Sequence, residues 1–335
     1  MAFIKVGATF MKAGMSYINI LCYHGFTVMS VLDCIGRTPL VLIENLNPNG
    51  HNGPIGKVRL FAKLEGSNPG GSVKDRIALY MIETAEKEGR LKDKTILEAT
   101  SGNTGIGLAM VGAAKGLKVK LVMPACVSLE RRRTLEALGA ELVLSPANEG
   151  TDGAIRLAAK ILASSPETYF MPDQFNNPAN ILAHYETTGP EIIEQTQGAV
   201  THFVAGMGTT GTIMGTGRRL KEFRKDIKII GVEPYLGHKI QGLKNMQESI
   251  VPGIYNPVAL DEKMNVNDDD AFRTARDLAV REGLFVGMSS GAAAFAAIQL
   301  AGRLEEGTIV AILPDRGDRY LSTSLFASVC AKCPP

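Results

Sequence analysis

The sequence has no run of apolar residues as long as the roughly 20 that a transmembrane helix needs. It also has little excess of either charge, because 36 Lys and Arg residues accompany 34 Asp and Glu residues, a formal net charge of +2. A strongly basic balance is typical of nucleic-acid binding, so this composition argues against it. The five histidines lack the spacing of metal ligands, and we expect no metal site. What remains is an ordinary globular composition, 45% hydrophobic and 21% charged.

A regular cysteine pattern is also missing. Five cysteines are an odd number, and their scatter does not resemble a disulfide framework, so we expect a reducing, cytoplasmic setting. The last two form a C-x-x-C pair close to the end of the chain, where we interpret it as coincidence. The five are Cys22, Cys34, Cys126, Cys330 and Cys333.

Strand-like and helical patterns alternate along most of the chain. This βαβ alternation predicts an α/β fold of parallel sheets with helices on both faces. We expect strands at 58–64, 95–99, 118–123, 141–144, 201–205, 228–232, 285–287 and 308–313. We expect helices at 77–89, 106–115, 128–138, 151–163, 179–195, 211–221, 268–281 and 291–302.

The 335 residues are too many for one typical core, so we expect two domains. Residues 171–178 interrupt the alternation and mark the crossing. We assign 57–178 to a smaller domain, and 29–56 with 179–325 to a larger one. Residues 1–28 and 326–335 are expected to be tails. Residues 1–28 fit no pattern, and translation starting at Met29 is the alternative to an unpacked tail.

The stretch 66–76, Gly-Ser-Asn-Pro-Gly-Gly-Ser-Val-Lys-Asp-Arg, joins the first long strand pattern to a helix. We expect Ser72 to be the helix N-cap and Asp75 to complete an approximate capping box. Lys74 then lies in the first turn, where the helix dipole disfavours a cation. Such a setting lowers the pKa of an amine and suits a lysine that reacts in its neutral form, although most lysines only face solvent.

Two more glycine-rich turns follow expected strands. Gly206-Met-Gly-Thr-Thr-Gly-Thr212 offers backbone N–H groups at a helix start, which suit a phosphate group. The same turn also matches the dinucleotide-binding pattern G-x-G-x-x-G, and Glu233 ends the next strand, where that pattern has an acidic residue. A dinucleotide-binding site therefore remains an alternative. Thr100-Ser-Gly-Asn-Thr104 lies between a strand and a helix and could hold a carboxylate, or could be an ordinary capped turn.

These three segments together resemble the signature set of fold-type II pyridoxal-phosphate enzymes, and most closely the O-acetylserine sulfhydrylase (cysteine synthase) family. The resemblance covers about residues 31–320. It implies two open, twisted, mostly parallel sheets flanked by helices, similar to the tryptophan synthase β chain. It also implies a bound pyridoxal 5'-phosphate and a homodimer.

The resemblance assigns roles to individual residues. Lys74 is the catalytic residue and forms the Schiff base, and Asn103 bonds the cofactor's ring hydroxyl. Ser289, in Gly287-Met-Ser-Ser-Gly291, faces the pyridine nitrogen, although it could equally cap the following helix. The phosphate is held by the loop Gly208, Thr209, Thr210, Gly211 and Thr212. The substrate carboxylate is held by Thr100, Ser101, Thr104 and Gln174.

The implied reaction is a β-replacement in which O-acetyl-L-serine and sulfide give L-cysteine and acetate. Within the family, Thr210 and the segment Asp315-Arg-Gly-Asp-Arg-Tyr320 resemble the B-type enzyme, which also accepts thiosulfate and then forms S-sulfocysteine. Lys244 falls about where that family has an arginine near the pocket mouth, and Lys239 could serve instead. The segment Asp315–Tyr320 follows the last expected strand, where ligands gather in open α/β sheets, and could line the pocket; we expect it to be a solvated charged loop.

Other readings stay open from the sequence. Cystathionine β-synthase shares the motifs, but its regulated members carry more chain at the C-terminus. A serine or threonine dehydratase has the same fold with a different asparagine loop. A nicotinamide-dependent dehydrogenase could use Gly206–Gly211, whereas an intact Lys74 argues against a non-catalytic scaffold.

Overall fold

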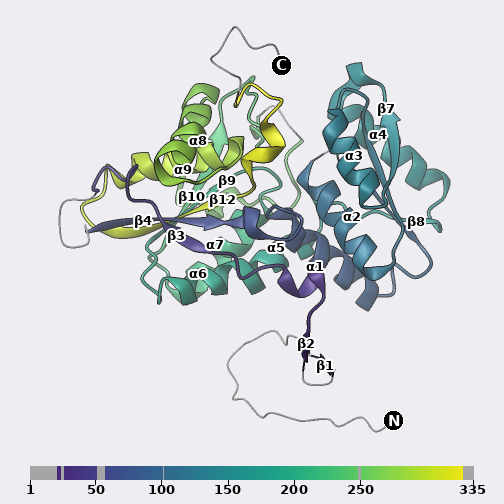
Figure 1. The fold of residues 1–335 in the computed structure, drawn as a ribbon, viewed down its shortest axis with the longest axis horizontal. Coiled ribbons are helices and arrows are strands. Elements are labelled where there is room, and N and C mark those ends of the chain that lie inside the picture. The colour runs from purple at the N-terminus through teal and green to yellow at the C-terminus, as the bar shows by residue number, and fades with distance from the viewer. Residues whose placement is uncertain (1–20, 24–25, 51–56, 101, 248–249, 327–335) are drawn as a thin grey trace.

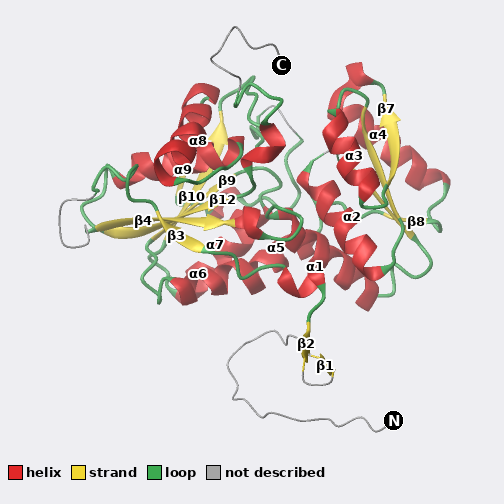
Figure 2. Cartoon of the chain, in the orientation of Figure 1, coloured by secondary structure: helices red, strands yellow, loops and turns green. Residues whose placement is uncertain are grey.

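The computed structural model describes residues 21–23, 26–50, 57–100, 102–247 and 250–326. Within them, two sheets stand side by side, each with helices packed against it (Figures 1 and 2). Nearly all of the strand pairs in the two sheets are parallel, which confirms the expected fold class.

The larger sheet has six strands in the order β11-β10-β9-β12-β4-β3, and only β3 runs antiparallel to its neighbour. In that order they are Glu262–Val266, Lys228–Pro234, His202–Gly206, Gly307–Leu313, Val58–Leu64 and Leu40–Leu42. Strand β12 is buried from Thr308 to its end, because its apolar run faces helices on both sides.

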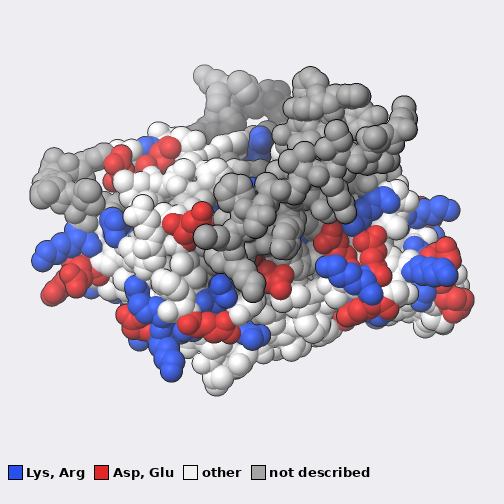
Figure 3. Space-filling view, turned by 90° about the horizontal axis from the view of Figure 1, so that it is seen from below, with Lys and Arg blue, Asp and Glu red and all other residues white. Residues whose placement is uncertain are grey.

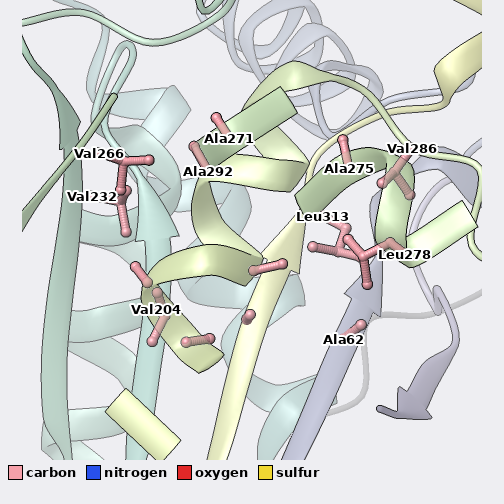
Figure 4. Packing of buried hydrophobic residues seen from close by; sticks show 14 of the residues in the cluster. Ala62, Val204, Val232, Val266, Ala271, Ala275, Leu278, Val286, Ala292 and Leu313 are labelled. Carbon is pink, nitrogen blue, oxygen red and sulfur yellow. The ribbon is translucent and has the colours of Figure 1, made fainter. Parts of the chain in front are cut away.

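Helices cover both faces of this sheet. Alternate residues of β12 point into two different cores, Ile309 into one and Val310 into the other. The first core includes side chains from α8 (Asp268–Glu282) and α9 (Met288–Ala301), and Figure 4 shows part of it. The second includes side chains from α6 (Gly189–Gln195) and α7 (Gly211–Phe223).

The smaller sheet has four parallel strands in the order β7-β6-β5-β8, which are Glu141–Ser145, Val119–Pro124, Thr95–Ala99 and Tyr169–Phe170. Its helices are α1 (Lys74–Lys87), α2 (Asn103–Lys115), α3 (Leu129–Ala137) and α4 (Gly150–Ser164). The chain returns to the larger sheet through α5 (Pro178–Ala183) and a π-helical turn, His184–Thr188.

Two expectations about these elements need correction. Strand β4 pairs with β12 and β3 in the larger sheet, so the smaller domain cannot start at residue 57. The division into two domains otherwise stays a prediction. The short strand expected at 285–287 is only an isolated bridge, between Val286 and Arg316.

The backbone of the N-terminal segment forms an antiparallel pair, β1 (Leu21–Tyr23) with β2 (Phe26–Val28), which lies apart from both sheets (Figure 1). The rest of that expected tail, and residues 327–335 with Cys330 and Cys333, lie outside the described residues. On the face in Figure 3, acidic and basic side chains are interspersed. No described helix is long and apolar enough to cross a bilayer.

Candidate active site

A cavity of about 440 Å³ lies between the two sheets and gathers most of the residues that the sequence singled out. The carboxyl ends of β5, β9 and β12 lead into the loops around it, which is where ligands collect in open α/β sheets. Candidate residues that line it are Lys74, Thr100, Asn103, Thr104, Gln174, Gly208, Thr209, Thr210, Thr212, Lys244 and Ser289. Ser101 lies outside the described residues. A larger cavity against α1 contains none of them.

Lys74 is the first residue of α1, and its partly buried side chain lines this cavity. Burial lowers the pKa of the amine to about 8, against the opposing pull of Asp315 and Glu65. The expected capping box is wrong. The N-cap is Val73 and not Ser72, and the Asp75 carboxylate accepts a bond from the N–H of Gly70 at 2.6 Å. The lowered pKa of this amine therefore follows from burial.

The loop between β9 and α7 has the shape that a phosphate group requires. Thr210 adopts a left-handed backbone with φ of 68°, and its buried hydroxyl has no hydrogen-bond partner within the described protein. A side chain at Gly208 would place its Cβ 2.4 Å from the carbonyl oxygen of Gly242. The unpaired hydroxyl and the backbone N–H groups at the start of α7 fit an anion in this loop.

Gly211 is the one loop member that does not line the cavity. A Cβ at Gly211 would lie 1.8 Å from the side-chain oxygen of Asn180, so the helix start is packed directly against that amide.

The alternative of a dinucleotide site at this loop loses support from Glu233. Glu233 is buried and engaged by Lys263 at 2.6 Å and by the N–H of Met246 at 2.8 Å, so it is not available to a ribose.

Sequence reasoning missed His184, which reaches the phosphate-loop residue Thr212. Its Nε2 lies 3.2 Å from the Thr212 hydroxyl, and its Nδ1 lies 2.9 Å from that of Thr188. Burial, and then the positive charge of Arg76, lower the pKa of His184 to about 3, so the ring is neutral. In the sequence it is one histidine inside an expected helix, a signal too weak to single it out.

Asn103 begins α2 and is held by the segment that we expected to be a solvated loop. Its side-chain NH2 group donates to Asp315 at 2.7 Å, and its oxygen accepts from Arg319. The hydroxyl of Tyr320 donates to the same Asp315 carboxylate at 2.6 Å. Asp315 and Tyr320 are buried and Tyr320 lines the cavity, whereas Arg316 and Asp318 are exposed. The expectation of a solvated loop is therefore wrong for the two residues that reach the site, and the alternative of a pocket-lining segment holds there. Their acid–amide–phenol pattern could have been recognised only with the fold in hand.

Thr104 and Gln174 meet across the cavity wall. The Thr104 hydroxyl donates to the side-chain oxygen of Gln174 at 2.7 Å, which leaves the NH2 group of Gln174 as a donor. Thr100 lines the same wall, two residues beyond Glu98 on β5. Hydroxyl and amide donors gathered in this way suit a carboxylate.

Ser289 and Lys244 complete the lining from the larger sheet. Ser289 is buried in the first turn of α9. The Lys244 ammonium lies 4.7 Å from the centre of the Phe175 ring, and burial lowers the pKa of this amine. Lys239 does not line the cavity. The described residues contain no cluster of His, Cys, Asp or Glu that could hold a metal ion.

Comparisons with known proteins agree with this geometry. A model of the family "Pyridoxal-phosphate dependent enzyme" matches residues 31–315. The cysteine synthase of Aquifex aeolicus is 51% identical over 89% of this chain and 92% of its own length. Cysteine synthase B of Salmonella typhimurium is 50% identical over 87% of this chain and 94% of its own. The crystal structure of a cysteine synthase from Entamoeba histolytica superposes with a TM-score of 0.84 at 39% identity, over 94% of each chain.

Proposed function

This chain belongs to the pyridoxal-phosphate dependent enzyme family and, within it, to the B-type cysteine synthases, and we propose how its cavity performs their reaction. It converts O-acetyl-L-serine and sulfide into L-cysteine and acetate. The observation that carries the assignment is a partly buried lysine with a pKa near 8, in one cavity with a glycine-rich loop whose buried Thr210 hydroxyl has no partner in the described protein.

Pyridoxal 5'-phosphate, when bound, supplies an electron sink for negative charge on the substrate's α-carbon. We assign its phosphate to Gly208–Thr212, where the Thr210 hydroxyl lacks a partner among the described atoms. Asn103 uses one N–H for Asp315 and keeps the other for the ring hydroxyl. Ser289 faces the ring nitrogen, and a neutral hydroxyl there leaves the ring a moderate sink.

We assign two tasks to Lys74. Its amine holds the cofactor, and once released it takes the α-proton onto Nζ as a general base. A pKa of about 8 keeps a useful fraction of the amine neutral near physiological pH, whereas an ordinary lysine at 10.5 would stay almost fully charged. The buried carboxyl group of Asp315 favours the protonated form of Lys74 and would stabilise the Lys74 ammonium that forms.

The substrate carboxylate is assigned to Thr100, Ser101, Thr104 and Gln174. Of these, Thr104 lies in the first turn of α2 and bonds Gln174. Because these residues belong to the smaller sheet and its exit segment, binding there draws the two sheets together and excludes water. We further propose that the enzyme is a cytoplasmic homodimer.

Thiosulfate is a finer proposal and depends on Lys244. Its ammonium lies over Phe175 in the cavity wall and provides positive charge for an anionic sulfur donor. Lys239 is less suitable, because the structure places it outside the cavity lining.

The test of the main proposal is the substitution Lys74→Ala. The wild-type protein should show the visible absorbance of a lysine-bound pyridoxal group, and borohydride should fix the group on the peptide that contains residue 74. The variant should keep the circular dichroism of the wild type and lose that band and the turnover. A colourless wild type that binds a nicotinamide dinucleotide, or a label on another lysine, would overturn the assignment.

A further inference from the structure

Glu98 is a buried carboxylate for which the reaction described above has no use. It is the penultimate residue of β5, it is only 4% exposed, and no described Lys, Arg or His forms an ion pair with it. Burying a charge without a counter-ion is costly, so its environment must supply other stabilisation. A buried carboxylate without a counter-ion is unusual, and such exceptions are expected mainly at functional sites.

That stabilisation comes from backbone N–H groups. The N–H of Asp173 donates to the Glu98 carboxylate at 2.9 Å, and the N–H groups of Ala99 and Gln174 also stabilise its charged form. Burial, followed by the nearby charge of Asp173, nevertheless raises the pKa of Glu98 to about 8. Two of these three donors belong to the segment that leaves the smaller sheet.

The segment that contains Asp173 and Gln174 is held on two sides. Asp173 has a φ of 50°, a left-handed conformation that a residue with a side chain adopts at a cost. On its other side, the NH2 group of Asn180 donates to the carbonyl of Gln174 at 2.7 Å and to the hydroxyl of Thr209 at 3.1 Å. Gln174 is therefore fixed through its N–H by Glu98 and through its carbonyl by Asn180.

We propose that Glu98 is a positioning residue that fixes the backbone of Asp173 and Gln174, so that the Gln174 carboxamide turns its NH2 group to the carboxylate of the amino-acid substrate. The proposal rests on the proposed function. Thr100 lies two residues after Glu98, directly beyond the end of β5, so one side chain sets the relative position of both sides of the carboxylate-binding wall. The Thr104 hydroxyl donates to the side-chain oxygen of Gln174 at 2.7 Å and so orients its carboxamide.

Above its pKa of about 8, Glu98 is a carboxylate, and its two oxygens act only as acceptors toward these N–H groups. An amide would present a donor to at least one of them. The unpaired N–H groups would then be left buried, and the segment would shift to regain partners. The substitution Glu98→Gln keeps the size of the side chain and removes only this property.

The experiment has a structural and a kinetic readout. At a pH above about 8, where Glu98 is ionised, hydrogen exchange in the substrate-free holoenzyme is followed by mass spectrometry of peptides that span 171–177. It should be about tenfold faster in Glu98→Gln. The KM for O-acetylserine should rise about tenfold, while the KM for sulfide and the visible absorbance of the cofactor stay close to those of the wild type. This split separates misplacement of the substrate carboxylate from a general loss of structure.

The matched control is Asp261→Asn. The Asp261 carboxylate also accepts a backbone N–H, from Ile229 at 2.8 Å, but it does not line the active-site cavity. It should leave the KM for O-acetylserine unchanged. If Glu98→Gln does not fold, the same readouts are taken from Glu98→Asp, which retracts the carboxylate by one methylene.

Unchanged exchange at 171–177 would overturn the proposal, as would faster exchange with an unchanged KM for O-acetylserine, or an equal KM increase in the control. An inactive wild type would instead refute the proposed function. In that case the exchange data still decide whether Glu98 holds the segment.

Discussion

Replacing Glu65 with glutamine tests whether a buried ion cluster holds the lysine loop in place. The cluster consists of Lys63, Glu65, Arg76 and Glu191. The Arg76 guanidinium bonds the fully buried Glu65 carboxylate at 2.7 Å and Glu191 at 2.6 Å, and Lys63 pairs with Glu191 at 2.7 Å. Because Glu65 and Arg76 flank the stretch that contains Lys74, the cluster ties both ends of that stretch to the larger sheet and to α6.

The magnitude follows from the carboxylate's pKa. Burial alone raises the pKa of Glu65, but Arg76, Lys63 and the Thr38 hydroxyl outweigh it and lower the value from 4.5 to about 2. At about 1.4 kcal/mol per pKa unit, this difference is worth about 3 kcal/mol. Removal of one partner from a buried ion pair typically costs about 3 to 5 kcal/mol, which agrees. Glu65→Gln should therefore lower the unfolding free energy by about 3 kcal/mol at pH 7.

The dependence on pH has a definite sign. Folding lowers this pKa, so the stabilisation is present above the unfolded value of 4.5 and is lost as the pH falls toward about 2. The difference between the wild type and Glu65→Gln should thus be constant from neutral pH down to about 5 and shrink below it.

Urea unfolding of the cofactor-free protein, followed by circular dichroism, measures this difference without the contribution of ligand binding. The control is Glu88→Gln, which breaks the Glu88–Arg90 pair, in which both side chains are about half exposed. An exposed pair contributes about 0 to 1 kcal/mol, so that variant should be nearly neutral. A loss below about 1 kcal/mol for Glu65→Gln, or equal losses in both variants, would refute the reasoning.

Two further predictions concern the cavity. Gly208→Ala should weaken pyridoxal-phosphate binding at least tenfold in an equilibrium titration, because the added Cβ meets the Gly242 carbonyl at 2.4 Å and the loop must shift. The control Gly302→Ala, whose added Cβ has its nearest contact at 3.6 Å, should bind pyridoxal phosphate as the wild type does. Equal affinities of the two variants would contradict the steric argument. Lys244→Ala should raise the KM for thiosulfate several-fold and leave that for sulfide nearly unchanged, and parallel losses in steady-state assays would remove the proposed role of Lys244.

Local spacing was enough to predict several parts of the site. Glycines and small polar residues directly after a strand pattern predict a tight turn at a helix start, and the loops at 100–104 and 206–212 lie at such starts. Lys74 could be singled out in the same way, because its place in the first helical turn depends only on neighbouring residues. The resemblance to a known family, which those motifs carry, is confirmed by the comparisons.

The tertiary structure decided which charged residues are buried. Asp315 reads as part of a polar loop in the sequence, yet Asn103, more than 200 positions earlier, donates to its carboxylate. Glu98 likewise gains its partner only when β5 meets the segment after β8 that contains Asp173, and His184 reaches Thr212 only when the π-helical turn packs against α7. Strand β4 joins the larger sheet because β12, from the far end of the chain, supplies its partner. Periodicity and turn chemistry report interactions over a few residues, whereas burial and strand pairing depend on contacts between distant segments, so the sequence by itself could predict the loops but not what surrounds them.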